Sequence, residues 1–306
     1  MTRRTKIAAA LIFLGILHGF VLFAGFLAPY PYAEQHREFP YAPPTGIHWR
    51  VSGARAPDVV FLLGSDAYGR DVFSRLLYGG RVSLFTGLLA AFLSLGLGLA
   101  LGTAAGFYGG WLDRLLMRAG ELVMALPWLY LLLAVRAFLP LHITSTQAFF
   151  LIVVIIGGVG WVRPARLIRG VVLSARERGF VLAARGFGAS DAYLIRRHIL
   201  PFTVGVVLTQ ATVLIPQYIL AEVALSFLGL GVGEPVPSWG NMLAEAQQYH
   251  AVVAHPWMLA PGLAIIPVLL GYLLLADTLL EKGDRRIIAP AGPARRAAQS
   301  RPPRPR

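Results

Sequence analysis

Cysteine is absent from the 306 residues, and lysine occurs only twice, at Lys6 and Lys282. Without cysteine the chain can form no disulfide, no thiolate metal site and no cysteine nucleophile. Neither lysine lies in the Gly-x-x-x-x-Gly-Lys pattern of a phosphate-binding loop. The short motifs of zinc peptidases, serine hydrolases and dinucleotide-binding enzymes are missing too. We therefore expect no enzyme activity, no catalytic residue, no bound metal and no cofactor on this chain.

Charged residues are also scarce, at 14% of the chain, whereas soluble domains carry about 25%. Hydrophobic residues reach 56% and the mean hydropathy is +0.63. The hydrophobic residues gather in six long blocks, and most of these reach the roughly 20 residues that a membrane-spanning helix needs. Six blocks of this kind in one chain disfavour a soluble all-α protein. The fold class predicted is an all-α integral membrane protein with six transmembrane helices, in the blocks 7–28, 82–107, 122–135, 149–162, 203–230 and 257–276.

The excess of basic residues predicts the orientation. Lysine and arginine number 28 against 15 acidic residues, for a net charge of +13. Most of the basic residues fall on one side if the N-terminus is cytoplasmic, so we expect both termini there. The first block is longer than the roughly 7–15 apolar residues of a signal peptide, which predicts a retained anchor. The charge would attract anionic membrane lipid. Nucleic-acid binding is not expected, because the arginines are scattered over separate loops without an aromatic platform.

The order of these segments divides the chain into four parts. Residues 1–28 form the cytoplasmic N-terminus and first span, and residues 29–81 an extracytoplasmic loop that ends in a polar motif. Residues 82–281 form a five-helix core, interrupted by a cytoplasmic loop at 163–201. Residues 282–306 are basic, and the Pro, Ala and Arg that dominate them from residue 289 onward predict a disordered cytoplasmic tail.

Two features inside the spans stand out. Gly98, Gly102, Gly106 and Gly110 recur at every fourth residue, which predicts a helix face that another helix can approach closely. Glu222 is a carboxylate deep in the fifth block, where exposure to lipid would be costly. It either lines a solute path or pairs with a polar neighbour, and the sequence leaves both alternatives open.

The segment 175–201 is too polar to span a membrane but has helical periodicity. Phe180, Ala183, Ala184 and Phe187 would form a small apolar face. Gly188 can end this helix in a left-handed conformation, and Ser190 can cap a second one. The prediction is two short cytoplasmic helices hinged at Gly188, with a turn at Pro201 into the fifth span. A hairpin lying on the lipid surface is the alternative, but a face this small and rich in alanine favours docking in a protein cleft.

Three separated motifs resemble one family. Ala183-Ala184-x-x-x-Gly188 followed by His198-Ile199-Leu200-Pro201 resembles the cytoplasmic coupling loop of ABC-importer permeases, although Leu182 stands in place of that loop's glutamate. The segments 63–79 and 221–243 resemble the pre-span motif and the fifth span with its outer loop in the C-type permease of the dipeptide/oligopeptide and nickel transport group. The resemblance covers nearly the whole chain except 31–60 and the tail.

The resemblance implies the permease fold of a type I ABC importer in a bacterial plasma (inner) membrane, carrying di- or oligopeptides or a related solute. The implied partners are a homologous second permease, two cytoplasmic ATP-binding subunits that hold ATP and Mg, and an extracytoplasmic solute-binding protein. It implies ATPase coupling by Phe180, Ala183, Ala184, Arg185, Gly188, Asp191, His198 and Pro201, a path or gate at Glu222, Ser238, Trp239 and Asn241, and a pre-span motif of Gly64, Asp66, Gly69, Arg70, Asp71 and Arg75.

A self-contained secondary transporter is the rival hypothesis. Such proteins more often show internal repeats and several carboxylates at mid-membrane for coupling ions. Here only Glu222 is clearly intramembrane.

Overall fold

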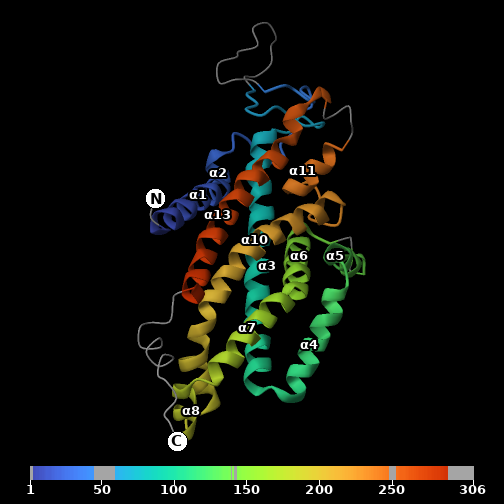
Figure 1. The fold of residues 1–306 in the computed structure, drawn as a ribbon. Coiled ribbons are helices and arrows are strands. Elements are labelled where there is room, and N and C mark those ends of the chain that lie inside the picture. The colour runs from blue at the N-terminus through green and yellow to red at the C-terminus, as the bar shows by residue number, and fades with distance from the viewer. Residues whose placement is uncertain (1–2, 45–58, 139, 141–142, 248–252, 289–306) are drawn as a thin grey trace, which may run out of the picture.

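The computed structural model describes residues 3–44, 59–138, 140, 143–247 and 253–288. Every regular element in these ranges is a helix, as predicted (Figure 1). In chain order they are α1 (Arg3–Leu22), α2 (Ala24–Leu27), α3 (Val72–Tyr108), α4 (Gly110–Ala125), α5 (Trp128–Ala137), α6 (Ser145–Gly160), α7 (Val162–Arg176), α8 (Gly179–Gly186), α9 (Asp191–Tyr193), the π-helical turn η1 (Leu194–Ile199), α10 (Leu200–Phe227), α11 (Trp239–Glu245), the 3₁₀ turn η2 (Pro256–Leu259) and α13 (Ala260–Ile288).

Four helical segments of the described chain are long and apolar enough to cross a membrane, and the number rises to six if each of two bent pairs is one span. The pairs are α4 with α5, bent by 94°, and α6 with α7, bent by 42°. The third and fourth predicted blocks therefore lie on these two bent pairs. Leu126 is extended because the following Pro127 disfavours a helical conformation before it. Pro164 lacks the N–H that would bond the carbonyl of Gly160.

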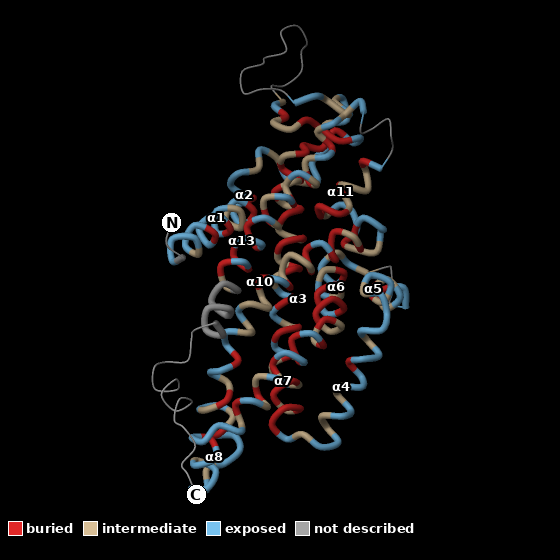
Figure 2. Tube along the Cα trace, in the orientation of Figure 1, coloured by how far each residue is buried: buried red, intermediate tan, exposed pale blue. Residues whose placement is uncertain are grey.

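Helix α3 is the central element, and buried residues follow its length (Figure 2). Three of the four periodic glycines face α7. A Cβ at Gly98 would lie 2.8 Å from Pro164, one at Gly102 would lie 2.5 Å from the carbonyl oxygen of Ala165, and one at Gly106 would lie 2.9 Å from Val172. The close approach predicted for this face is confirmed at these positions. Gly110 is different, because α3 ends at Tyr108 and Gly110 opens α4.

We expect Gly102→Val to destabilise the contact between α3 and α7 by about 1–3 kcal/mol, because the added carbon meets backbone that cannot move aside. Gly96→Val is the matched control: Gly96 lies on the same helix and a Cβ there meets nothing within 4 Å. The Tm of each purified variant in detergent measures the effect. Equal Tm values for the two variants would contradict the packing described here.

Several boundaries differ from those predicted. Helix α3 begins at Val72, ten residues before the predicted span, because Asp71 caps it by accepting from the backbone N–H of Ser74 at 2.7 Å. Helix α7 packs along α3, so the predicted loop 163–201 begins with a helix that follows α6 after a bend of 42°. Helix α13 runs to Ile288, so 282–288 are helical and not disordered, while 289–306 lie outside the described residues.

The predicted second short helix of the loop is not a separate element. Residues Asp191–Phe227 form one continuous helical rod of 37 residues, made of α9, η1 and α10. Pro201 falls in the first turn of α10, where a missing N–H costs little, and the preceding residues form the π-helical turn. The expected turn at Pro201 is therefore wrong.

Candidate functional site

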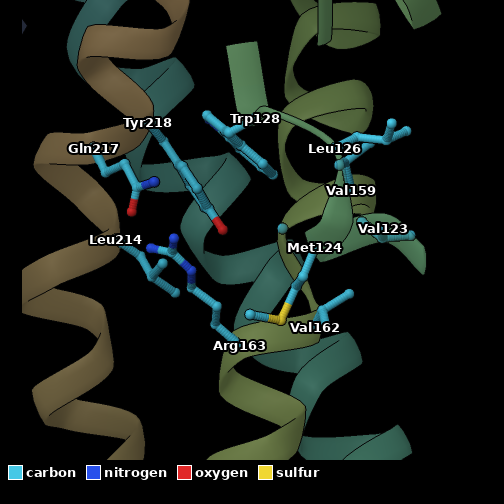
Figure 3. Close-up of a pocket in the computed structure, with 11 residues that line it drawn as sticks. Val123, Met124, Leu126, Trp128, Val159, Val162, Arg163, Leu214, Gln217 and Tyr218 are labelled. Atoms are coloured by element: carbon cyan, nitrogen blue, oxygen red, sulfur yellow. The ribbon is translucent and has the colours of Figure 1, made fainter. Parts of the chain in front are cut away.

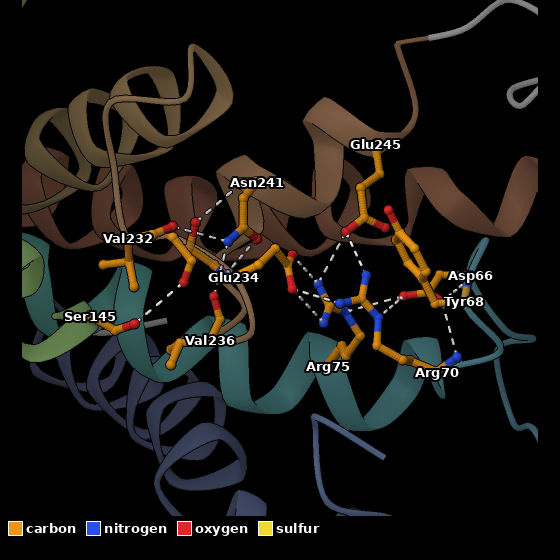
Figure 4. Close-up of polar contacts among 12 residues, drawn as sticks. Asp66, Tyr68, Arg70, Arg75, Ser145, Val232, Glu234, Val236, Asn241 and Glu245 are labelled. Carbon is orange, nitrogen blue, oxygen red and sulfur yellow. Dashed lines mark hydrogen bonds and ion pairs between the residues drawn. The ribbon is translucent and has the colours of Figure 1, made fainter. Parts of the chain in front are cut away.

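The two ends of the molecule carry the residues that the sequence singled out. The loop with α8 lies at one end, and α11 lies at the other with the residues that precede α3 (Figure 1). At the α11 end, charged side chains from three chain segments meet in a cluster, which we call the outer ion cluster (Figure 4). Its members are Asp66, Arg70, Arg75, Glu234 and Glu245.

The two arginines hold the outer ion cluster together. Arg70 donates to Asp66 at 2.5 Å, to Glu234 at 2.6 Å and to Glu245 at 2.8 Å. Arg75 is only 1% exposed and donates to Glu234 at 2.8 Å and to Glu245 at 3.2 Å. The cluster thus ties the start of α3 to the loop after α10 and to the end of α11.

Local geometry places Asp66 and Arg70. The backbone N–H groups of Tyr68 and Arg70 donate to the carboxylate of Asp66 at 2.8 and 3.0 Å, which closes a tight turn. Gly64 and Gly69 have φ of +80° and +72°, a conformation that favours glycine. A Cβ at Gly64 would also lie 2.7 Å from the indole nitrogen of Trp257. The residues of the pre-span motif therefore build a rigid loop.

The charges of the outer ion cluster balance when one carboxyl is neutral. Burial raises the pKa of Glu245 to about 7, against the lowering effect of Arg75 and Arg70. Burial alone would raise the pKa of Glu234, but the hydrogen bond and charge of Arg75 and Arg70 hold it below its usual value. Although burial disfavours its charge, Arg70 has a raised pKa because Asp66, Glu245 and Glu234 surround it. Below about pH 7, two arginines then face two carboxylates and a neutral Glu245.

The raised pKa predicts a pH dependence of stability. A carboxyl whose pKa is higher in the folded protein than its ordinary 4.5 stabilises the fold fully below pH 4.5, and that contribution is lost as the pH rises through about 7. Glu245→Gln mimics the protonated carboxyl, so we expect the variant to be more stable than the wild type at pH 8 by about 2 kcal/mol and equal to it at pH 4.5. Thermal unfolding of both proteins at the two pH values measures this. A variant less stable than wild type at pH 8 would contradict it.

Of the residues that the sequence offered as an outer gate, Ser238 and Asn241 cap α11, and Trp239 fixes it to α3. The Ser238 hydroxyl accepts from the N–H of Asn241 at 3.2 Å, and the Asn241 side chain bonds back to the N–H of Ser238 at 2.8 Å. The indole of Trp239 donates to the carbonyl of Leu76 at 2.9 Å. All three side chains lie inside this packing, so here they anchor α11.

Glu222 is completely buried between α10 and its neighbours. The hydroxyl of Ser226, one turn later, donates to its carboxyl at 2.6 Å. The hydroxyls of Ser83 on α3 and Ser238 at the start of α11 also surround it. Of the two alternatives left open by the sequence, this geometry favours a polar pair over a residue that lines an open path.

At the other end, α8 ends as predicted. Gly188 has φ of +85°, and the N–H groups of Ala189 and Gly188 bond to the carbonyls of Ala184 and Arg185 at 3.1 and 3.0 Å. This hydrogen-bond pattern closes a helix through a left-handed residue. Ser190 then caps α9, with Asp191 in its first turn.

The small apolar face predicted on α8, which we expected to dock in a protein cleft, lies largely at the surface of the chain. Val181 is fully buried and Ala184 packs beside it, whereas Ala183 is exposed and the ring of Phe187 is 93% exposed. Leu182, at the position of the missing glutamate, is exposed as well. The helix thus presents an apolar outer surface of Phe180, Leu182, Ala183 and Phe187, which we call the α8 outer surface.

Aromatic and cationic contacts connect α8 to two long helices. The Arg178 guanidinium lies 4.3 Å from the ring centre of Phe202 on α10, and that of Arg185 lies 5.3 Å from Phe107 on α3. The ring of Phe180 lies against those of His198 and Phe202. A displacement of α8 would therefore act on the rod Asp191–Phe227, whose far end carries Glu222.

The sequence missed two members of the outer ion cluster. Glu234 and Glu245 flank the 237–243 motif. Because Arg70 and Arg75 of the pre-span motif need acidic partners when buried, these two arginines are the sequence signal that could have indicated both glutamates. Within the described residues, no group of three or more His, Cys, Asp or Glu side chains is arranged to hold a metal ion.

Comparison with known proteins gives consistent matches. A family described as binding-protein-dependent transport system inner membrane component matches residues 98–288. The dipeptide transport system permease protein DppC of Alkalihalophilus pseudofirmus is 35% identical over 91% of this chain and 86% of its own length. The protein of that name from Bacillus subtilis is 33% identical, over 93% and 83%. The glutathione transport system permease protein GsiD of Escherichia coli is 36% identical, over 93% and 88%.

Proposed function

Because the chain belongs to the family of binding-protein-dependent transport system inner membrane components, we propose that it is a permease subunit of an ATP-driven ABC importer for short peptides. The cargo follows from the similar proteins, whose names specify dipeptides and glutathione, itself a small peptide. The proposed partners are a homologous second permease, two ATP-binding subunits in the cytoplasm and a solute-binding protein outside.

The observation that carries this function is the continuous connection between the two ends of the molecule. The α8 outer surface is apolar and exposed, which suits it to a cleft on an ATP-binding subunit. Arg178, which precedes α8, contacts Phe202 on α10, and Arg185 on α8 contacts Phe107 on α3, so a displacement of α8 reaches both long helices. A coupling element of this kind shifts the permease between two states only if the ATP-bound and ATP-free subunits contact it differently.

Purification of the tagged chain from its native membrane tests the assembly. We expect a second permease and two ATP-binding subunits to co-purify with it. A homodimer that transports solute without ATP would support a secondary transporter and refute the proposal.

The orientation proposed is α8 in the cytoplasm and α11 outside, with both termini inside the cell. Because the chain has no cysteine, single cysteines report sidedness cleanly. Gly186→Cys and Gly233→Cys introduce thiols at exposed positions where a Cβ meets nothing within 4 Å. We expect an impermeant thiol reagent to label Gly233→Cys in intact spheroplasts, and Gly186→Cys only after the membrane is opened. Labelling of both in intact spheroplasts would contradict this topology.

A further inference from the structure

A pocket opens where the two bent helix pairs meet α10. The bend between α4 and α5, the bend between α6 and α7, and the middle of α10 all contribute to its wall (Figure 3). Its volume is about 100 Å³. In Figure 3 the guanidinium of Arg163, the amide of Gln217 and the hydroxyl of Tyr218 point into one space, with Trp128 beside Tyr218.

The depth of Arg163 in the membrane follows from its neighbour on α3. Pro164 packs against Gly98, ten residues before α3 ends at Tyr108, which is about 15 Å at 1.5 Å per residue. Gly98 lies well inside the apolar part of α3. Arg163 therefore lies at the depth of the hydrocarbon layer, and its side chain is exposed on this subunit. Exposing a charged arginine to lipid at such a depth costs too much free energy, so Arg163 faces water or a polar partner.

Arg163 differs from the next two arginines of α7. Arg169 pairs with Asp113, and Arg166 lies 3.5 Å from the sulfur of Met124. No carboxylate among the described residues forms an ion pair with Arg163.

The rest of the pocket wall is preformed. The Trp128 and Tyr218 rings are stacked, with centroids 5.9 Å apart. The Tyr218 hydroxyl shares a hydrogen bond of 2.9 Å with Ser94, and its close approach requires a glycine at 160. The aromatic wall is therefore fixed, and the Arg163 guanidinium points into the same space (Figure 3).

We propose that this pocket binds a carboxylate of the passing solute, such as the C-terminus of a short peptide, with Arg163 as the charged donor and Gln217 as a neutral donor. The assignment rests on the proposed function. A guanidinium can grip a carboxylate through two parallel N–H bonds. A cavity of about 10–15 Å³ admits one water molecule, so a volume of about 100 Å³ has room for a carboxylate group. The pocket would recognise only the carboxylate at one end of the peptide, so it would not discriminate between peptides with different side chains.

The test compares uptake of a dipeptide that has a free carboxylate with uptake of its C-terminal amide. Uptake of both compounds is measured with the complete reconstituted complex and the same solute-binding protein. Any preference of that protein for acid or amide therefore affects wild type and variants equally and cancels when their ratios are compared. Arg163→Gln should lower the ratio of acid to amide uptake about tenfold, because charged hydrogen bonds are worth about 1.5–3 kcal/mol. Arg166→Gln is the control, as this arginine lies one turn along the same helix and does not line the pocket. Its ratio should equal that of the wild type.

A second variant acts without removing the arginine. Gln217→Glu puts a carboxylate of nearly the same shape beside Arg163 and should also lower the acid-to-amide ratio by occupying the guanidinium. An unchanged ratio in both variants would overturn the proposal, as would an equal fall in Arg166→Gln. Loss of the second permease from purified Arg163→Gln would assign the arginine to the subunit interface and would overturn it too. A wild-type complex that transports neither compound would instead refute the proposed function.

Discussion

Arg75→Met should lower the stability of the protein by about 1.5–3 kcal/mol, the cost of losing its hydrogen bonds to charged carboxylates that are only partly exposed. The Arg75 side chain is 1% exposed and contacts both Glu234 and Glu245. Methionine fills much of the same volume but leaves these carboxylates facing each other with only Arg70 between them. We expect a large fall in Tm in detergent at pH 8.

The matched control is Arg118→Met, which breaks an ion pair with Glu121 on the surface of α4. Exposed pairs of this kind contribute about 0–1 kcal/mol, so its Tm should change little. The double variant Arg75→Met with Glu245→Gln should recover part of the loss, because it removes one uncompensated carboxylate. Equal Tm values for Arg75→Met and Arg118→Met would show that the outer ion cluster does not hold this end of the molecule together.

Gly188→Val should abolish transport while leaving the protein inserted and folded. Gly188 has φ of +85°, a conformation that costs a residue with a Cβ about 1–2 kcal/mol and a β-branched residue more. The strain falls on the turn that aims α8, where the N–H of Gly188 and that of Ala189 close the helix. We expect uptake to fall at least tenfold and recovery of the ATP-binding subunits to weaken.

Gly170→Val is the control for this substitution, because Gly170 lies in helix α7 and a Cβ there meets nothing within 4 Å. The readouts are uptake, recovery of the partner subunits and the amount of chain in the membrane. If α8 merely rested on lipid, Gly188→Val would transport normally. Wild-type uptake together with wild-type recovery of the ATP-binding subunits would therefore exclude the coupling role.

Features set by local chemistry could be predicted from the sequence. Block length and apolar composition located the spans because backbone amides in lipid must bond within a helix. Gly188 was identified as a left-handed helix stop because glycine adopts that conformation at little cost. Ser190 was identified as a cap because its hydroxyl can accept from the first turn. Each of these signals lies within a few residues of its effect.

Features set by tertiary contacts could not be predicted. Arg75 meets Glu234 and Glu245 across 159 and 170 residues of sequence, and no local pattern relates them. On α8 the periodicity identified Phe180, Ala183, Ala184 and Phe187 as an apolar docking face. It did not indicate Val181, which is buried because tertiary neighbours orient a helix of eight residues. Arg163 looked like part of a cytoplasmic loop because its segment is basic. In the structure that segment forms α7, which packs closely against the glycine face of α3.

Peptide uptake into proteoliposomes tests the central claim most directly. The chain is reconstituted with its second permease and the two ATP-binding subunits, with loaded solute-binding protein on the α11 side and ATP on the α8 side. The account predicts peptide accumulation that requires ATP and stops when either the ATP-binding subunits or the solute-binding protein is omitted. Accumulation by this chain alone, driven by an ion gradient and indifferent to ATP, would contradict it.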